Sequence, residues 1–451
     1  MYCLALEDFR GFHQQGFVSI RPITILIGEN SAGKSSFLSA IKYMMDFVSG
    51  NSEASFNKDP FQLGTFQQIA HYRGGKAGRA KSFFITLKTN VDRSRRQPHV
   101  EPDISVEFRI AFESSESQPV ISAIHISTKA GSLSASIDNR RFRVEITLKD
   151  GGTYPIEEGN DFPRFARNDF TRYWPFLLRD LRYRLSRRNR GSEGQLFPNA
   201  PDLDVSHFIE VADALSEKLS GPIEATSAIR TKPLRTYTPG AEAPDGEGSH
   251  VPFEIAKLFR ATNKDPWRRL KSNLEDFGTA SGMFREISVK SFGRSASDPF
   301  QIQLSSDGPK TNLVDLGYGT SQVIPIIYNI SSQSPRSTHL IQQPEVHLHA
   351  RAQAALGQYF VESYLGNGSE FVLETHSDFI VDRVRQAVFQ RRISPDDVSI
   401  LFFERGRLEN HITEVSLDTN GEPVDAPSSY RSFFVDEQLR TLGVEPIDTN
   451  H

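Results

Sequence analysis

The feature that most constrains this chain is a short loop, Gly28 to Ser35, which carries two glycines, a lysine and a serine at fixed spacing. Its sequence, GENSAGKS, fits the pattern G-x-x-x-x-G-K-[ST] at every fixed position. A β-branched run at 23–27 predicts a buried strand before the loop, and apolar residues at helical spacing from 37 to 44 predict a helix after it. The segment therefore reads as a strand, a phosphate-binding loop and a helix.

Each fixed position of this loop has a physical reason. Gly28 and Gly33 permit backbone angles at which successive amides face phosphate oxygens, and Lys34 reaches the β and γ oxygens. The serine hydroxyl suits Mg²⁺, and the helix adds the partial positive charge of its N-terminus. A glycine loop that merely caps a helix is the alternative, which the matched strand and helix disfavour. We expect ATP and Mg²⁺ as ligands and these nucleotide-binding residues: Gly28, Glu29, Asn30, Ser31, Ala32, Gly33, Lys34, Ser35 and Ser36.

The composition excludes several classes of protein. The chain has 451 residues, enough for two or three domains at ~100 to 200 residues each. With 37% hydrophobic and 24% charged residues it is neither disordered nor collagen-like, and no run approaches the ~18 apolar residues of a membrane span. The start lacks a signal peptide, and the single cysteine, Cys3, excludes an internal disulfide framework. A cytoplasmic globular protein is expected.

Three segments of the chain differ in pattern. Residues 1–155 contain the phosphate loop and then, from about Ser82 to Asp150, short alternating segments that predict an antiparallel β lobe. Residues 156–225 have helical periodicity and many arginines, which predicts an inserted helical subdomain. Residues 226–451 form the predicted C-terminal lobe, in which apolar strands alternate with helices from Phe300 to Phe403, as a parallel α/β sheet requires. We expect one sheet to combine the α/β pieces from the two ends of the chain.

Four further motifs give the chain a family resemblance. They are, in chain order, LEDFRGF before the phosphate loop, LGYGTSQ at 316–322, LIQQPEVHLHARAQ at 340–353 and LETHSDFI at 373–380. These motifs resemble the first strand and turn, the signature motif, the Walker B strand with its D-loop, and the histidine switch of ABC-type ATPases of the SMC, RecF and OLD kind. The resemblance covers roughly residues 1–75 and 300–440. It implies an α/β fold: an ABC-type P-loop ATPase head with an antiparallel β lobe and an inserted helical subdomain.

Two residues of these motifs are candidate phosphate sensors. Ser321 follows two glycines at a place where a helix can begin, which favours an anion site. The resemblance implies that this serine contacts the γ-phosphate held by a second subunit; an ordinary helix start is the alternative. His376 follows an apolar strand, at the sheet edge where ligands bind in open α/β proteins. The resemblance implies that it senses the γ-phosphate, whereas a structural histidine is the alternative.

The chain departs from the family at Gln342-Gln343-Pro344-Glu345. The family pattern at these positions is an acidic residue, then Glu or Gln, then Pro-Glu. An amide cannot accept a proton from water, and it neutralises less metal charge than a carboxylate does. We therefore expect slow hydrolysis, with Gln342, Gln343, Glu345 and His376 as the catalytic candidates. Two explanations fit Gln342: a natural ATP sensor that hydrolyses ATP slowly, or a deliberate change of glutamate to glutamine that traps the bound nucleotide. Glutamine has nearly the shape of glutamate and lacks only its charge, which favours the second. Glu345 is a candidate substitute carboxylate.

Other candidate groups have weaker signals. Arg10, in the opening turn, is expected to face the nucleotide, as arginines there do in relatives. Gln67 or Gln68 is expected to couple Mg²⁺ to the adjoining lobe, so the predicted metal-binding residues are Ser35 and Gln68. Solvent exposure is the alternative for Arg10 and both glutamines. His347 and His349 resemble a metal pair but have no third ligand nearby in sequence, so no metal is assigned to them.

The middle segment concentrates positive charge in a chain whose net charge is −4. Its arginines stand among aromatic residues, against only Asp169 and Asp180: Arg164, Arg167, Arg172, Arg179, Arg182, Arg184, Arg187, Arg188 and Arg190. Arginine suits phosphate oxygens and aromatic rings stack on bases, so this pattern is compatible with a DNA contact through Arg179, Arg182, Arg187 and Arg188. It is equally compatible with pairing to acidic residues of a neighbouring subunit.

The resemblance also suggests a function. It points to the ATPase subunit of a two-component bacterial anti-phage system, which senses an invader and controls a separately encoded nuclease or toxin. The segment 233–248 resembles part of standalone defence-type ATPases, although a turn-rich connector explains it equally well. Head-to-head dimers within a homo-oligomer are expected because each site needs Ser321 of a second copy. Two rivals stay open: a RecF-like DNA-repair ATPase, and a non-hydrolysing scaffold that uses ATP as structural glue.

Overall fold

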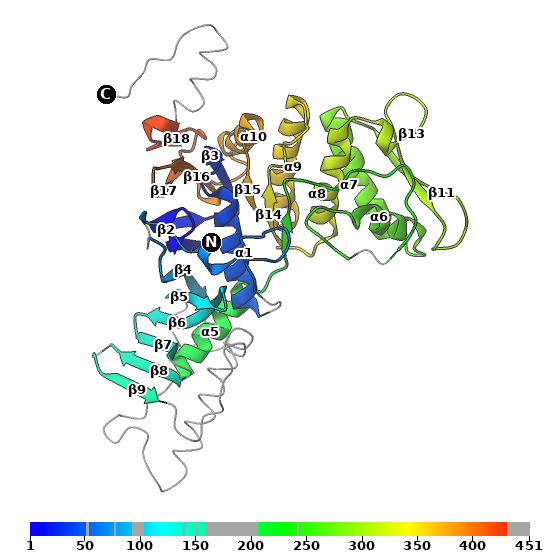
Figure 1. The fold of residues 1–451 in the computed structure, drawn as a ribbon. Helices are drawn as coiled ribbons and strands as arrows, with labels where there is room; N and C mark the ends of the chain where they lie inside the picture. Colours follow the sequence, from blue (N-terminus) through cyan, green and yellow to red (C-terminus); the bar gives the residue numbers. More distant parts are fainter. Residues whose placement is uncertain are drawn as a thin grey trace. The chain divides into compact units, whose positions relative to one another are not determined.

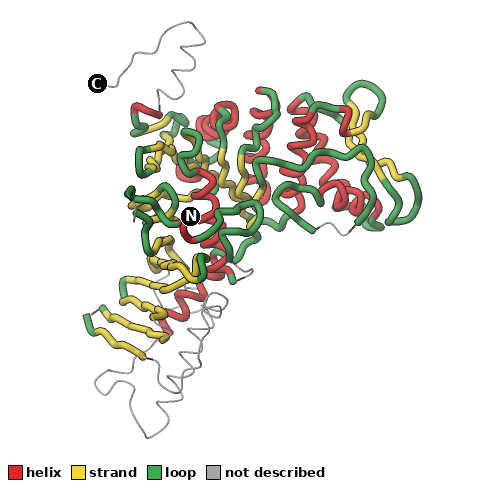
Figure 2. Tube along the Cα trace, viewed as in Figure 1, coloured by secondary structure: helices red, strands yellow, loops and turns green. Residues whose placement is uncertain are grey.

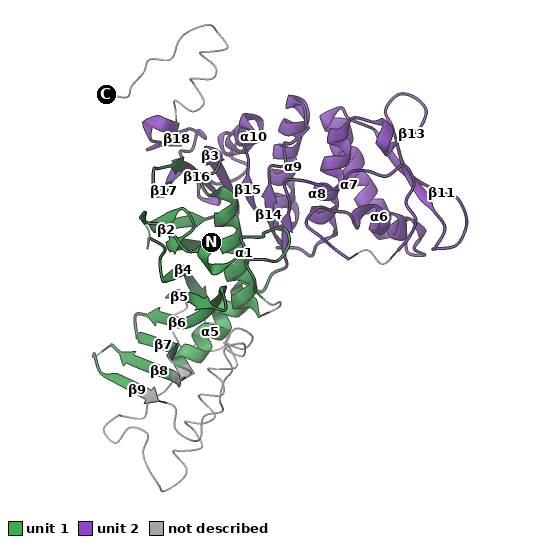
Figure 3. Ribbon diagram, in the orientation of Figure 1, with its two compact units in different colours: residues 1–20, 31–221, 404–412 green, residues 21–30, 222–403, 413–451 purple. Residues whose placement is uncertain are grey.

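A computed structural model describes residues 1–50, 54–75, 78–92, 103–138, 141–149, 151–157, 206–240 and 243–430. The chain divides into two compact units that are interleaved in sequence (Figure 3). Unit 1 comprises Met1–Ile20, Ser31–Gly221 and Glu404–Ile412, and unit 2 comprises Arg21–Asn30, Pro222–Phe403 and Thr413–His451. The predicted division at 1–155, 156–225 and 226–451 stays a prediction. Most of the arginine-rich insertion lies outside the described residues, and so do Arg179, Arg182, Arg187 and Arg188.

Unit 1 is built on an antiparallel sheet of eight strands in the order β2-β1-β4-β5-β6-β7-β8-β9, drawn as yellow strands in Figure 2. The strands are β1 (Tyr2–Phe9), β2 (Phe12–Ile20), β4 (Ser82–Asp92), β5 (Asp103–Ser115), β6 (Gln118–Thr128), β7 (Gly131–Asp138), β8 (Arg141–Leu148) and β9 (Thr153–Glu157). Alternate residues of β4, such as Phe83, Ile85 and Leu87, are fully buried. The predicted antiparallel lobe is thereby confirmed.

Within the described ranges of unit 1, three helices accompany this sheet. They are α1 (Lys34–Ser49), α2 (Phe66–Ile69) and α5 (Ser206–Lys218). Helix α1 contacts both β4 and α5. Aromatic rings fill the space beside α1: Tyr43 stacks on Phe56 at 4.2 Å between centroids, and Phe83 stacks on Phe112 at 4.7 Å. This aromatic packing fixes the helix that follows the phosphate loop.

Unit 2 contains the parallel strands of a seven-stranded sheet, ordered β10-β14-β15-β3-β16-β17-β18 (Figure 1). The strands are β3 (Ile23–Gly28), β10 (Ile223–Thr226), β14 (Thr338–Gln342), β15 (Glu370–Glu374), β16 (Val398–Arg405), β17 (Asn410–Leu417) and β18 (Pro423–Val424). Strand β3 pairs in parallel with β15 on one side and with β16 on the other. One sheet therefore combines α/β pieces from the two ends of the chain, as predicted.

In the part of unit 2 that the structure describes, five helices and a small sheet complete the unit. The helices are α6 (Val251–Arg260), α7 (Asp265–Ser281), α8 (Tyr318–Ser332), α9 (Ala350–Asn367) and α10 (Asp378–Phe389), with the short 3₁₀ turns η1 (Leu313–Asp315) and η2 (Pro395–Asp397). The small antiparallel sheet contains β11 (Glu286–Ser291), β12 (Phe300–Ser305) and β13 (Thr311–Asn312). Apolar residues of β3, β14 and β15 share one core with α7, α8, α9 and α10. Among the described residues, no helix has both the length and the apolar character needed to cross a membrane.

Candidate functional site

The first half of the phosphate loop leaves the sheet in unit 2. All six residues of β3 are buried, and the strand ends at Gly28. Gly28 has φ +126°, and a Cβ atom there would lie 2.1 Å from the carbonyl oxygen of Phe403 in β16. Only glycine fits so close to a neighbouring backbone in this conformation. The amide of Glu29 then donates to the same carbonyl over 3.3 Å, which fixes the exit of the loop.

The second half of the loop belongs to unit 1 and opens α1. Gly33 precedes the helix with φ +97°, and its carbonyl accepts from the amide of Phe37 at 2.9 Å. No side chain of the described residues caps this N-terminus, and no acidic residue lies in its first turn. Lys34 and Ser36 are buried there, at 3% and 8% exposure. The N-terminus of α1 has the form of an anion site whose amides and positive dipole end suit phosphate.

Replacing Gly33 by alanine should weaken ATP binding by about tenfold or more, because strained left-handed backbone and overpacking each cost ~1 to 3 kcal/mol. The new Cβ would lie 2.7 Å from the ring of Phe12. Titration of a fluorescent ATP analogue measures the affinity. The matched control is Gly16→Ala in β2, where a Cβ meets nothing within 4 Å. Equal affinity in the two variants would contradict the tight fit at Gly33.

The carboxyl ends of three parallel strands meet at the edge from which the loop leaves unit 2. Gln342 of β14 lies beside Glu374 of β15, and Glu374 lies beside Leu26 of β3. Ligands of open α/β sheets bind at such an edge. Gln342 and Gln343 are partly buried there, whereas Glu374 is only 6% exposed. Sequence reasoning missed Glu374, although an acidic residue that ends an apolar strand is a detectable signal.

Glu345 joins the turn after β14 to the turn that carries His376. Its Oε2 accepts from the Thr375 hydroxyl and its Oε1 accepts from the His376 amide, both at 2.7 Å. Burial raises the pKa of Glu345, and the two donated hydrogen bonds oppose that rise. Because both carboxylate oxygens are engaged, the geometry favours a structural link over the predicted substitute carboxylate. The His376 side chain is exposed, at the predicted sheet edge.

The Ser321 hydroxyl is engaged inside its own helix, and its predicted contact with a γ-phosphate stays a prediction. Helix α8 begins at Tyr318, and Ser321 lies inside its first turn at 6% exposure. Its hydroxyl donates to the carbonyl of Tyr318 at 2.7 Å, so it is already used within the helix. The exposed residues at this helix start are Gly317 and Tyr318. Sequence spacing predicted the start of this helix correctly, but it could not show which residues of the first turn are buried.

The start of α8 contacts the turn after β14. A Cβ on Gly319 would lie 2.3 Å from the carbonyl oxygen of His347, and the Tyr318 ring meets the His347 ring edge-on at 4.7 Å. His349 caps α9 by accepting from the amide of Ala352 at 3.3 Å. The two histidines therefore have structural contacts within unit 2.

Gln68, the glutamine predicted to couple Mg²⁺, is engaged in a helix cap, and its role toward the metal stays a prediction. The Oε1 of Gln68 accepts from the backbone amide of Thr65 at 2.7 Å and closes a capping box around α2. Arg10 lies beside the same helix, where its Nη1 donates to the carbonyl of Gln68 at 2.9 Å and its Nε to the Ser36 hydroxyl at 3.4 Å. Burial, followed by repulsion from Arg79, lowers the pKa of Arg10. Arg10 is thus close to the start of α1, and its nucleotide role stays a prediction.

Mg²⁺ fits the residues of the site only in part. The Ser35 hydroxyl, in the first turn of α1, suits this cation, but the engaged amide of Gln68 does not. Gln342 offers an amide in place of the carboxylate that Mg²⁺ prefers. Throughout the described ranges, no group of three or more His, Cys, Asp or Glu side chains is arranged to hold a metal. Ser35 is the residue that would hold Mg²⁺ beside a bound triphosphate.

Arg230 is a buried residue of this region that sequence reasoning missed. It follows β10, the strand that pairs in parallel with β14, and is 1% exposed. Its Nη2 donates to the carbonyls of Gln342 at 3.1 Å and Gln343 at 2.9 Å. No local sequence pattern distinguishes this arginine from the many exposed ones.

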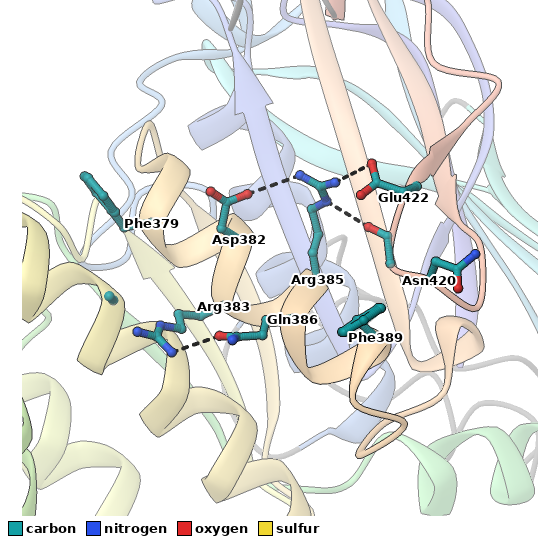
Figure 4. A pocket seen from close by; sticks show the side chains of 10 residues that line it. Phe379, Asp382, Arg383, Arg385, Gln386, Phe389, Asn420 and Glu422 are labelled. Carbon is teal, nitrogen blue, oxygen red and sulfur yellow. Dashed lines mark hydrogen bonds and ion pairs between the residues drawn. The ribbon is translucent and has the colours of Figure 1, made fainter.

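A surface groove of about 490 Å³ lies elsewhere in unit 2, between α9, α10 and the turn before β18 (Figure 4). Arg385 spans it and donates to Asp382, Glu422 and the carbonyl of Gly421. Two exposed aromatic side chains, Phe379 and Phe389, stand at its margins. None of its lining residues belongs to the phosphate loop or to the turn after β14, so we assign the groove no part in nucleotide binding.

The phosphate loop at the edge of a parallel sheet, with the glutamine and histidine turns on the same edge, defines a P-loop ATPase. The chain belongs to the family AAA_21, described as "AAA domain, putative AbiEii toxin, Type IV TA system", which matches residues 23–382. The recognition of a P-loop ATPase from its motifs is thereby confirmed, and ATP binding follows from this membership. No curated protein matches the chain significantly.

Solved structures of SMC heads are similar to this chain over most of their length. A SMC head bound to the C-terminal winged-helix domain of ScpA has 12% identity and a TM-score of 0.45, with 92% of this chain and 98% of that chain covered. The SMC head domain from Thermotoga maritima has 11% identity and a TM-score of 0.38, with 94% and 98% covered. These scores are too low to assign any property, so the family match carries the assignment.

Proposed function

We propose that this chain is an ATP-dependent head that associates with a second copy when it holds ATP and thereby controls a separately encoded nuclease or toxin effector of a bacterial anti-phage system. One observation carries the proposal. The loop leaving β3, the turn after β14 and the exposed His376 turn lie at one sheet edge, and the start of α8 packs on the turn after β14.

The start of α8 supplies the reason for a second copy. Its exposed residues, Gly317 and Tyr318, lead a helix of 15 residues whose N-terminus carries partial positive charge. In the proposed dimer this helix end, rather than the Ser321 hydroxyl, faces the γ-phosphate held by the other copy. A triphosphate bound by Lys34 of one copy and by α8 of the next would join the two copies.

The family description supports the effector part of the proposal. It names a "putative AbiEii toxin" and a "Type IV TA system". A P-loop ATPase whose association depends on ATP provides a switch for control of an effector, since ATP would favour the associated state by mass action. Co-purification of this chain with the product of the neighbouring gene would identify the effector partner and what triggers its activity.

The proposed head hydrolyses ATP slowly. Gln342 and Gln343 occupy the positions where the family pattern has an acidic residue followed by Glu or Gln, and neither amide can accept a proton from water. When bound, Mg²⁺ would neutralise part of the phosphate charge. A second candidate function, a non-hydrolysing scaffold held together by ATP, is favoured by the same two amides. Incubation with labelled ATP distinguishes them: slow release of phosphate fits the switch, and none fits the scaffold.

Mass measurement of the purified chain with and without ATP tests the proposal. The expected result is a doubling of mass with ATP, which Lys34→Ala abolishes. Expression with the neighbouring gene's product should yield a complex whose nuclease or toxin activity changes with ATP. A chain that binds ATP but keeps one mass in both conditions would contradict ATP-dependent association.

The close contact at Gly319 leads to a stability prediction. Gly319→Ala should lower the free energy of unfolding by ~1 to 3 kcal/mol, because its Cβ would collide with the backbone at His347. The matched control is Gly317→Ala, two residues earlier, where a Cβ meets nothing within 4 Å. Its expected effect is below ~0.5 kcal/mol. Urea titration of both variants measures the difference, and equal midpoints would show that the contact is loose.

A further inference from the structure

The guanidinium of Arg230 is placed where two successive carbonyls of the turn after β14 converge. Its Nη2 alone donates to the oxygens of Gln342 and Gln343, at 3.1 and 2.9 Å. Both contacts are to backbone, so Arg230 constrains the backbone of the turn rather than one side chain. Because its guanidinium is charged, each of these hydrogen bonds is about twice as strong as one between neutral groups.

The turn needs such a constraint because Gln343 has a strained backbone. Its φ is +42°, in the left-handed region that non-glycine residues rarely adopt. Such a conformation persists only where the surroundings fix it. On one side the amide of Gln343 donates to the carbonyl of Glu374 at 2.7 Å, and on the other its carbonyl accepts from Arg230. Hydrogen bonds to both the amide and the carbonyl of Gln343 therefore fix its backbone conformation.

The segment that carries Arg230 is itself fixed beside α8. The amide of Ser227 donates to Gly246 at 2.8 Å, and the amide of Thr231 donates to Glu247 at 3.0 Å. The next residue, Gly248, packs so closely on α8 that a Cβ there would lie 2.6 Å from Cβ of Pro325. Arg230 therefore connects the loop beside α8 to the turn after β14.

Arg230 is kept charged in an unfavourable place. Its Nε and Nη1 are buried and meet no hydrogen-bond partner in the described part of the chain. Burial lowers the pKa of Arg230 to about 10, and the charge of Glu345 opposes that shift. Buried charges with unmatched donors usually destabilise a protein relative to apolar residues of similar size. Retaining an arginine here is therefore explained by what it positions rather than by the stability it adds.

We propose that Arg230 is a positioning residue that holds the turn 342–349 in the conformation that meets the start of α8. It does not touch the nucleotide. Through its two backbone contacts it keeps Gln342 at the sheet edge and His347 against Gly319, so that the helix end and the turn move as one body. The role of this body in ATP-dependent association rests on the proposed function, whereas the order of the turn is measurable without it.

Hydrogen exchange of the full chain, followed by mass spectrometry, tests this assignment. In Arg230→Met, peptides covering 343–349 should exchange at least about tenfold faster, since a hydrogen bond from a charged group is worth about a factor of ten or more. Peptides covering the phosphate loop, 23–36, should exchange as in the wild type. Arg230→Lys keeps a charged donor and should show a local rise of only about threefold, because its ammonium lacks the planar fork of arginine. Arg235→Met is the matched control, since Arg235 is an exposed residue of the same segment paired with Asp315.

The outcomes separate positioning from a merely structural role. A rise confined to 343–349, graded from methionine to lysine, supports the proposal. Unchanged exchange in these peptides, or an equal rise throughout unit 2, overturns it. If Arg230→Met does not fold, the lysine variant decides by the same local comparison. If the wild type keeps one mass with ATP, the proposed association fails, whereas the exchange result on Arg230 still stands.

Discussion

Lys34→Ala should abolish measurable ATP binding. Lys34 opens α1 directly after Gly33 and is only 3% exposed, so its side chain is almost wholly buried. A charge-assisted hydrogen bond is worth ~1.5 to 3 kcal/mol, and loss of two of them lowers affinity by at least about 100-fold. Isothermal titration calorimetry with ATP measures this loss.

The control for this experiment is Lys81→Ala, which removes an exposed lysine of the same unit. It should leave ATP affinity unchanged, which rules out a general effect of net charge. Thermal unfolding of Lys34→Ala without nucleotide should confirm that the variant is folded. Undiminished affinity in a folded Lys34→Ala protein would refute the phosphate loop as the ATP site, and with it the proposed association.

Gln342→Glu should raise ATP turnover by about 100-fold, since a carboxylate holds Mg²⁺ better than an amide does, and a bound metal stabilises transition-state charge by several kcal/mol. Gln342 ends β14 beside the buried Glu374, at the edge from which the phosphate loop leaves β3. The substitution changes charge and proton affinity with little change of shape. Release of inorganic phosphate under saturating ATP and Mg²⁺ measures the turnover.

Gln303→Glu is the matched control, because it makes the same chemical change on β12, in the small sheet of unit 2. It should leave turnover at the wild-type level. If Gln342→Glu also leaves turnover unchanged while ATP still binds, position 342 has no catalytic role. The two amides would then not support the proposal that this chain hydrolyses ATP slowly.

Local sequence predicted the elements around the phosphate loop closely. The run at 23–27 became β3, which ends at Gly28, and the helix begins at Lys34 as the motif requires. The expectation of one sheet from the two ends of the chain is confirmed by the position of β3 between β15 and β16. These predictions succeed because hydrophobic periodicity and glycine spacing are properties of short segments.

The roles of individual side chains were harder to predict. The side chains of Gln68 and Ser321 each bond to the backbone three residues earlier, which the motifs around them did not indicate. The sequence pattern around Arg230 does not differ from that of an exposed arginine; its burial depends on the pairing of β10 with β14. The helix α7 and the small sheet of unit 2 also fell outside the predicted alternation of strands and helices.

The position of β3 in the sheet has a consequence for the order of events during synthesis. Both strands that flank β3 lie in the last part of the chain, Glu370–Glu374 and Val398–Arg405. The strand that carries Gly28 therefore lacks both neighbours until residues 370–405 have been translated. We expect the nascent chain to bind nucleotide only after that point.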